Sequence, residues 1–233
     1  IHDYKYMKRI ILSILILITL TFSASSHVGH YKKFNYLEYD LFRNDKLIGN
    51  HKYFFERNNN ILTVKSIVNF KITKLGVDLY KYFAESDEIY KNNSFFSFNS
   101  KTKQNKKDKY VNISTDKEKN KLVIDGSSYK GLADIDNIVG TWWNHEIIKS
   151  KAQISAISGR IIEQDVIFLG KEKIQLGNKT YNTLHFKFKS SDKGLPENKR
   201  LDTDIWYEEN TYLWVKAQFI KQGNWEYRIK VIN

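Results

Sequence analysis

Cysteine is absent from this sequence of 233 residues, and its absence excludes several kinds of chemistry. Without thiols the chain forms no disulfide, presents no cysteine nucleophile and offers no thiolate ligand to a metal. A bacterial lipoprotein carries its lipid on a cysteine at the cleavage site, so that form of membrane anchoring is excluded as well.

Long apolar runs are also missing. The longest one, residues 10–22, has 13 residues, whereas a membrane-spanning helix needs ~20. It follows Lys8 and Arg9, and a short apolar core behind basic residues is typical of a secretory signal peptide. An uncleaved N-terminal anchor is the alternative.

Two small residues, Ala24 and Ser26, stand where the −3 and −1 positions of a signal-peptidase site would fall. We therefore predict a signal peptide region over residues 1–26, cut after Ser26, and a periplasmic or secreted product. Residues 1–6 lie ahead of Met7 and have the character of an over-extended gene start that is not translated.

Familiar catalytic signatures are missing too. The chain has no nucleophile elbow, no phosphate-binding loop and no dinucleotide fingerprint. His145-Glu146 is reminiscent of the zinc-peptidase helix His-Glu-x-x-His, but the fifth position is Lys149, a cation where the second ligand would stand. We expect no metal, no cofactor and no catalytic residue.

The charge of the chain is strongly positive, with a formal net charge of +12. Only six of the 38 basic residues are arginine, although readers of bases and phosphates favour its bidentate guanidinium. We expect no nucleic-acid partner and attribute the charge mainly to genome composition. Attraction to an anionic membrane surface remains a secondary possibility.

Alternation of apolar and polar residues dominates the sequence beyond residue 30, and this period of two is the pattern of half-buried strands. Between the runs stand Asn-, Asp- and Gly-rich turns at hairpin spacing, which predict an antiparallel meander. No internal repeat of fixed period is present. Strands are expected near residues 34–43, 47–57, 62–72, 77–90, 94–103, 109–115, 121–125, 160–169, 181–190, 201–208, 212–221 and 225–231.

Two segments interrupt the meander. Alternation stops over residues 129–158, where we predict one short helix near 141–149, capped by Thr141. Residues 190–200 read as a loop with the only proline. About a dozen antiparallel strands are too many for a flat sheet. We therefore predict an all-β fold, a meander curled into a barrel or half-barrel, as one domain over residues 27–233.

Aromatic side chains are unusually abundant, at 15% of the residues. Trp142 and Trp143 are adjacent, and Trp206, Tyr207, Tyr212 and Trp214 fall in a second cluster across a predicted hairpin. Such residues pin sheet register and fill cores, which is the simpler interpretation. The functional one is that they line the concave face of a curled sheet that holds an apolar ligand.

Several short motifs occur in a characteristic order and cover almost all of residues 34–232. They are Gly49 early in the second strand, Tyr80 and Tyr82 in a tyrosine-rich strand, Trp142-Trp143-Asn144, and Asp204-x-Trp206-Tyr207. This order resembles a family of exported bacterial β-rich proteins described as a domain of unknown function, from which Glu208 departs where an aspartate is expected. The resemblance implies no catalytic site. More distantly, the architecture is similar to the periplasmic half-barrels that carry lipoproteins.

We predict a non-enzymatic envelope protein that binds an apolar or amphipathic ligand, such as a lipid or acyl chain. Its candidate binding residues are Trp142, Trp143, Asn144, Trp206, Tyr207 and Trp214, with Asn144 orienting a polar head group. One alternative is a structural or protein-interaction module with a filled interior. The other is an envelope hydrolase, which would need a cleft where Asp202, Asp204, His145 or Glu146 converge with perturbed protonation. The sequence does not indicate the oligomeric state.

Overall fold

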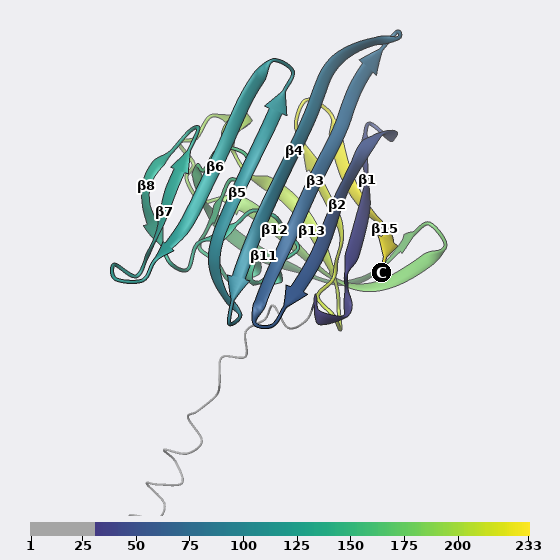
Figure 1. Cartoon of the computed structure of the whole chain (residues 1–233). Coiled ribbons are helices and arrows are strands. Elements are labelled where there is room, and N and C mark those ends of the chain that lie inside the picture. The colour runs from purple at the N-terminus through teal and green to yellow at the C-terminus, as the bar shows by residue number, and fades with distance from the viewer. Residues whose placement is uncertain (1–30) are drawn as a thin grey trace, which may run out of the picture.

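The computed structural model describes residues 31–233, and most of this part of the chain is β-structure (Figure 1). The predicted signal peptide lies outside the described residues. Two short 3₁₀ helices, η2 (His145–Ile148) and η3 (Glu197–Lys199), interrupt the strands. The strands are β1 (Tyr36–Arg43), β2 (Lys46–Asn58), β3 (Ile61–Lys74), β4 (Val77–Lys91), β5 (Ser94–Gln104), β6 (Lys107–Asp116), β7 (Lys121–Gly126), β8 (Lys130–Asp134), β9 (Ile138–Val139), β10 (Ala152–Ile154), β11 (Ile161–Leu176), β12 (Lys179–Ser190), β13 (Asp202–Glu208), β14 (Trp214–Ile220) and β15 (Asn224–Ile232).

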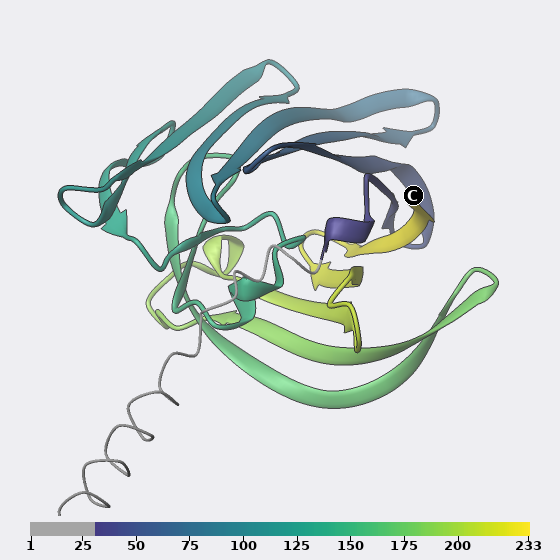
Figure 2. The same ribbon diagram turned by 60° about the horizontal axis from the view of Figure 1, so that its bottom comes forward.

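All fifteen strands belong to one sheet, whose order is β8-β7-β6-β5-β4-β3-β2-β1-β15-β14-β13-β12-β11-β10-β9. Neighbours are antiparallel except for β9 and β10, which are parallel. The sheet curls around an interior but does not close, so β8 and β9 remain its two edges (Figure 2). The predicted all-β antiparallel half-barrel is therefore confirmed.

The meander follows from its turns. Four two-residue hairpin loops begin with an asparagine in the left-handed region, at φ between 48° and 53°: Asn44, Asn59, Asn92 and Asn105. Asparagine tolerates this conformation better than most residues with a side chain. Each strand consequently returns beside its predecessor.

The interrupted segment differs from the prediction. Residues 129–158 contain β8, β9 and β10 besides one helix, and that helix is a single 3₁₀ turn capped by Asn144 rather than by Thr141. The side chain of Asn144 accepts a hydrogen bond from the backbone N–H of Glu146 at 3.1 Å. Trp142, at φ 62°, prevents a helix from starting at Thr141.

The predicted strand over residues 160–169 is also too short. β11 continues to Leu176, because Gly170, at φ 127°, absorbs a register shift against β12 without ending the strand. The loop over residues 190–200 is confirmed and contains η3.

The core lies inside the curl and is largely aromatic. Trp143 and Trp214 are both 0% exposed, and the ring centroids of Trp214 and Tyr39 stack at 4.1 Å. A second apolar cluster, around Phe98 and Ile113, fills the space between β5–β8 and β9–β10. No helix within residues 31–233 combines the length and the apolar character required to cross a bilayer.

Candidate functional site

Residues 141–148, which we call the plug segment, cross the interior of the half-barrel. On one side the hydroxyl of Tyr53, on β2, donates a hydrogen bond to the carbonyl oxygen of Thr141 at 2.5 Å. On the other side the hydroxyl of Tyr207, on β13, donates to the carbonyl oxygen of Trp142 at 2.9 Å. The plug segment therefore ties the two walls of the curled sheet together.

A buried carboxylate, Glu88 on β4, is the main anchor of the plug segment. It accepts hydrogen bonds from Nε1 of Trp143 at 2.8 Å, from Oγ1 of Thr141 at 3.0 Å and from the hydroxyl of Tyr90 at 2.6 Å. Burial raises the pKa of Glu88, and the three donors counteract part of that rise by stabilising the charged form.

Asn144 extends this network to the protein surface. Its Nδ2 donates to the hydroxyl oxygen of Tyr90 at 3.1 Å, while its Oδ1 caps η2. Because both ends of the amide are engaged, Asn144 and Tyr90 are held in fixed orientations. Both residues also line an open cleft.

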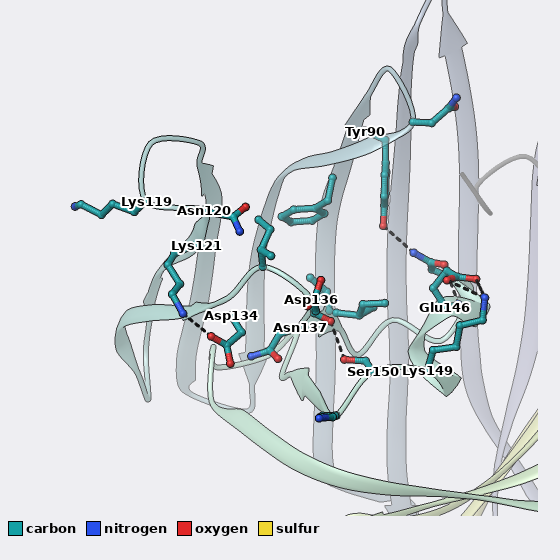
Figure 3. Close-up of a pocket in the computed structure, with 17 residues that line it drawn as sticks. Tyr90, Lys119, Asn120, Lys121, Asp134, Asp136, Asn137, Glu146, Lys149 and Ser150 are labelled. Carbon is teal, nitrogen blue, oxygen red and sulfur yellow. Dashed lines mark hydrogen bonds and ion pairs between the residues drawn. The ribbon is translucent and has the colours of Figure 1, made fainter. Parts of the chain in front are cut away.

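The cleft has a volume of about 870 Å³ and lies between the β4–β5 turn, the β6–β7 turn, the segment after β8 and η2 (Figure 3). Tyr90, Phe95 and Ile138 supply apolar surface. Its polar lining comes from Asn93, Lys119, Asn120, Lys121, Asp134, Asp136, Asn137, Asn144, Glu146, Lys149, Ser150 and Lys151.

Ion pairs order part of the polar lining. Nζ of Lys121 lies 2.5 Å from a carboxylate oxygen of Asp134, and Nζ of Lys149 lies 3.1 Å from one of Glu146. The cleft therefore presents both signs of charge beside an apolar floor, which suits a ligand that has both a polar group and an apolar part.

The structure brings most of the predicted binding residues together, although in the packed interior. Trp142 contacts Trp214 with ring centroids 5.4 Å apart, and Trp143, Tyr207 and Trp214 are fully buried. Of the predicted set, Asn144 alone lines the cleft.

Trp206 is not part of this group. It lies on the opposite face of β13 from Tyr207, because neighbours in a strand point to opposite sides. There its ring stacks on that of His185 at a centroid distance of 4.1 Å, and Nζ of Lys216 lies 4.7 Å from its centroid.

The four residues that a hydrolase would need do not form one centre. Asp204 lies on the outer face of β13, with Oδ1 2.8 Å from Nε2 of His185 and Oδ2 3.0 Å from Nζ of Lys187. His145 is buried on the inner side, where its ring stacks on Tyr212 at 4.6 Å. Within the described chain, no group of three or more His, Asp or Glu residues is arranged to hold a metal.

Sequence reasoning missed Glu88 and Tyr90, the residues that connect the plug segment to the cleft. A signal for Glu88 was present, because it shares the alternation of Tyr82 and Tyr90 and so falls on the inward face of β4. An acidic residue at an inward position needs buried hydrogen-bond donors. The sequence does not reveal which distant segment supplies them.

Three buried ring nitrogens have no hydrogen-bond partner within residues 31–233: Nε1 of Trp142, Nε1 of Trp214 and Nδ1 of His51. The ring centroid of His51 lies 6.1 Å from that of Trp214, so these groups are close neighbours. Burial lowers the pKa of His51 to about 3, and its Nε2 lies 2.7 Å from Oγ of Ser66. The interior thus contains polar atoms that side chains alone do not satisfy.

Comparisons with known proteins bear on the fold and the family. A family model described as a domain of unknown function, DUF6134, matches residues 39–230. No curated protein matches the sequence significantly. Among solved structures, the chain is similar to the beta-barrel-like protein of domain of unknown function DUF1849 from Brucella abortus, with a TM-score of 0.57 and 11% identity over 85% of this chain and 96% of that one. At this identity the likeness concerns the fold alone.

Proposed function

The chain belongs to the DUF6134 family, and on that premise we propose that it is a non-enzymatic ligand-binding protein of the bacterial cell envelope. The ligand is amphipathic, such as a lipid or another molecule with an acyl chain. Its polar group is held in the cleft by Asn144 and the charged lining, and its apolar part lies on Phe95 and Ile138. Export through a signal peptide cut after Ser26 belongs to the same proposal.

One observation carries this proposal: Asn144 and Tyr90 belong both to the cleft lining and to the buried network of Glu88. A recognition site works best when its polar groups are held in place before the ligand arrives. The amide of Asn144 is buried and hydrogen-bonded at both ends, whereas Lys119, Lys149 and Lys151 are exposed, so the amide is the orienting group.

A specific observation favours a second candidate, a structural or protein-interaction module. Trp143 and Trp214 are 0% exposed, so the side chains that were predicted to line an aromatic cavity instead fill the interior around the plug segment. In that case the plug segment only holds the two walls together, and the cleft is a surface irregularity.

Native mass spectrometry of the protein purified from its own cell type, followed by solvent extraction, distinguishes the two candidates. We expect a bound amphipathic molecule that is released on unfolding. Asn144→Asp removes the Nδ2 donor but keeps an oxygen for the cap of η2, so this variant should carry less ligand. Asn182→Asp, at an exposed position on β12, makes the same chemical change and should leave the ligand in place. An empty wild-type protein, or equal ligand in both variants, favours the structural module.

A further inference from the structure

Four hairpin turns gather at the end of the half-barrel opposite the cleft. They are the β1–β2, β3–β4, β5–β6 and β14–β15 turns, and we call this end the hairpin rim. The backbone N–H of Asn44 donates to the carbonyl oxygen of Asn224 at 2.8 Å, and that of Asn105 donates to the carbonyl oxygen of Lys81 at 2.9 Å. The first bond joins the β1–β2 turn to the start of β15, and the second joins the β5–β6 turn to β4.

The β3–β4 hairpin projects beyond the other turns at the top of Figure 1. Its end carries exposed apolar residues. Leu75, at its tip, is 95% exposed, and Val77 and Leu79 beside it are 62% and 55% exposed. At the turns of the opposite end, the large apolar side chains Ile61 and Phe96 are only 37% and 39% exposed.

Leu75 is unusual for its backbone as well as for its exposure. It occupies the first position of a two-residue turn at φ 51°, where four equivalent turns of this chain use asparagine. Leucine fits the left-handed region poorly, and it gains nothing from burial here. Neither folding nor solubility explains an apolar residue at this tip. Exposed apolar side chains of this kind are typical of a surface that a partner covers.

The charge around the tip indicates the chemistry of that partner. Residues 43–47, 71–81, 103–109 and 220–223 together contain ten basic and three acidic residues. Asp78 is paired with Lys71 and Lys81, at 3.6 Å and 3.1 Å between the charged atoms. Lys74 is exposed beside the tip, and Lys106 and Lys107 are exposed at the β5–β6 turn, which lies next to Lys81 on β4. Apolar side chains that project from a basic surface are complementary to an anionic membrane surface.

We propose that the hairpin rim docks this protein onto an anionic lipid bilayer. Leu75, Val77 and Leu79 insert at the boundary between head groups and acyl chains, and the surrounding lysines contact the head groups. A second copy of the chain is a poorer occupant, because two rims with the same excess of positive charge repel each other.

Docking of this kind orients the molecule. β4 runs from the rim at Val77 to the cleft at Tyr90, a length on the order of 45 Å at the usual rise of an extended strand. The cleft therefore faces away from the bilayer and stays open to solvent. The inference is independent of the proposed ligand, since the rim and the cleft share no residue.

Co-sedimentation with vesicles tests the inference. We compare vesicles of phosphatidylcholine with vesicles of phosphatidylcholine and phosphatidylglycerol, using the purified protein with the same N-terminus in every variant. The wild type should bind the anionic vesicles, more weakly at high salt, and bind the neutral ones far less. The triple variant Leu75→Asn, Val77→Thr, Leu79→Thr should lose affinity for the anionic vesicles by about tenfold or more.

Phe168→Thr is the matched control. Phe168 lies on β11, away from the rim, and is 54% exposed, almost the same as Leu79. It should bind vesicles like the wild type, and circular dichroism should show that all variants are folded. Three outcomes overturn the inference: equal binding to both vesicle types, undiminished binding by the triple variant, or an equal loss in Phe168→Thr. A rim-dependent dimer in sedimentation velocity, without vesicle binding, would instead assign the surface to a second copy.

Discussion

The indole of Trp143 donates a 2.8 Å hydrogen bond to the carboxylate of Glu88, a residue 55 positions earlier in the chain. Both side chains are buried, so this bond takes the place of the hydrogen bonds that each group makes to water in the unfolded chain. It joins the plug segment to β4 and supplies one of the donors that a buried carboxylate needs in an aromatic core.

Two substitutions of Trp143 should separate the contribution of its hydrogen bond to the free energy of unfolding from that of its packing. We expect Trp143→Phe to lower the free energy of unfolding by about 1–3 kcal/mol, because a donor to the buried carboxylate is lost. Trp143→Ala should lower it by about 3–5 kcal/mol, because a large core cavity forms as well. Urea denaturation measures both. Trp206→Phe is the control: the indole of Trp206 is also buried, but it donates to Glu172, an exposed carboxylate on the outer face, so this variant should have a smaller effect. An equal loss in the two Phe variants would contradict this account.

Glu88→Gln should change how stability depends on pH. Burial raises the pKa of Glu88 above its ordinary value of 4.5. The folded state therefore binds a proton at the Glu88 carboxylate more tightly than the unfolded state does. This difference adds to the free energy of unfolding below pH 4.5, and the contribution is lost as the pH rises through the folded-state pKa. Glutamine does not titrate, so the stability of the variant relative to the wild type should increase over that range. Unfolding free energies measured at intervals from pH 4.5 to 8 check this, and parallel curves would rule it out.

His51 should act in the opposite direction. Its pKa is lowered by burial from 6.5 to about 3, so only the unfolded state takes up a proton between these values. The contribution of His51 to the free energy of unfolding should therefore be constant above pH 6.5. Below pH 6.5 it should fall by about 1.4 kcal/mol per pH unit. His51→Gln keeps a group that can bond to Ser66 and should reduce this acid slope. If the slope persists in the variant, another group is responsible for it.

Gly49→Ala should be strongly destabilising. A Cβ at this position would lie 2.1 Å from the carbonyl oxygen of Asn69 and 2.5 Å from Cβ of Phe70, both fixed by strand β3. The strands would have to separate, which we expect to lower the free energy of unfolding by about 1–3 kcal/mol. Gly177→Asn is the control, because nothing lies within 4 Å of its added Cβ and its φ of 57° suits asparagine. Thermal unfolding of the two variants gives the comparison.

Leu75→Asn should stabilise the protein by about 0.5–1 kcal/mol, because asparagine accepts the left-handed conformation that leucine strains to adopt. The reverse exchange, Asn105→Leu, lies at φ 53° in the next hairpin of the rim and should destabilise by a similar amount. Chemical denaturation measures both. A loss of stability in Leu75→Asn would show that Leu75 supports the fold, which would weaken its assignment to membrane docking.

Several features of the molecule could be predicted because they depend on short-range rules. Strand alternation is local, so the inward positions of Leu62, Val64 and Phe70 on β3 follow from their spacing alone. The asparagine turns are local as well, and they impose an antiparallel meander. The same alternation places Trp206 and Tyr207 on opposite faces, a consequence that the grouping of all aromatics into one site overlooked.

The candidate site depends on contacts between residues that are far apart in the sequence. Asn144 was predicted as a polar contact, but its partner Tyr90 lies 54 residues away and becomes a neighbour only when the sheet curls. β9 and β10 are too short to show a period, and they exist because the ends of the sheet pack against each other. The sequence by itself determined the strands and turns of the regular meander, since those preferences act between near neighbours. Only the tertiary structure decided that Glu88 anchors the plug segment and that the cleft and the hairpin rim lie at opposite ends, because burial and charge at a point depend on every segment that the fold brings there.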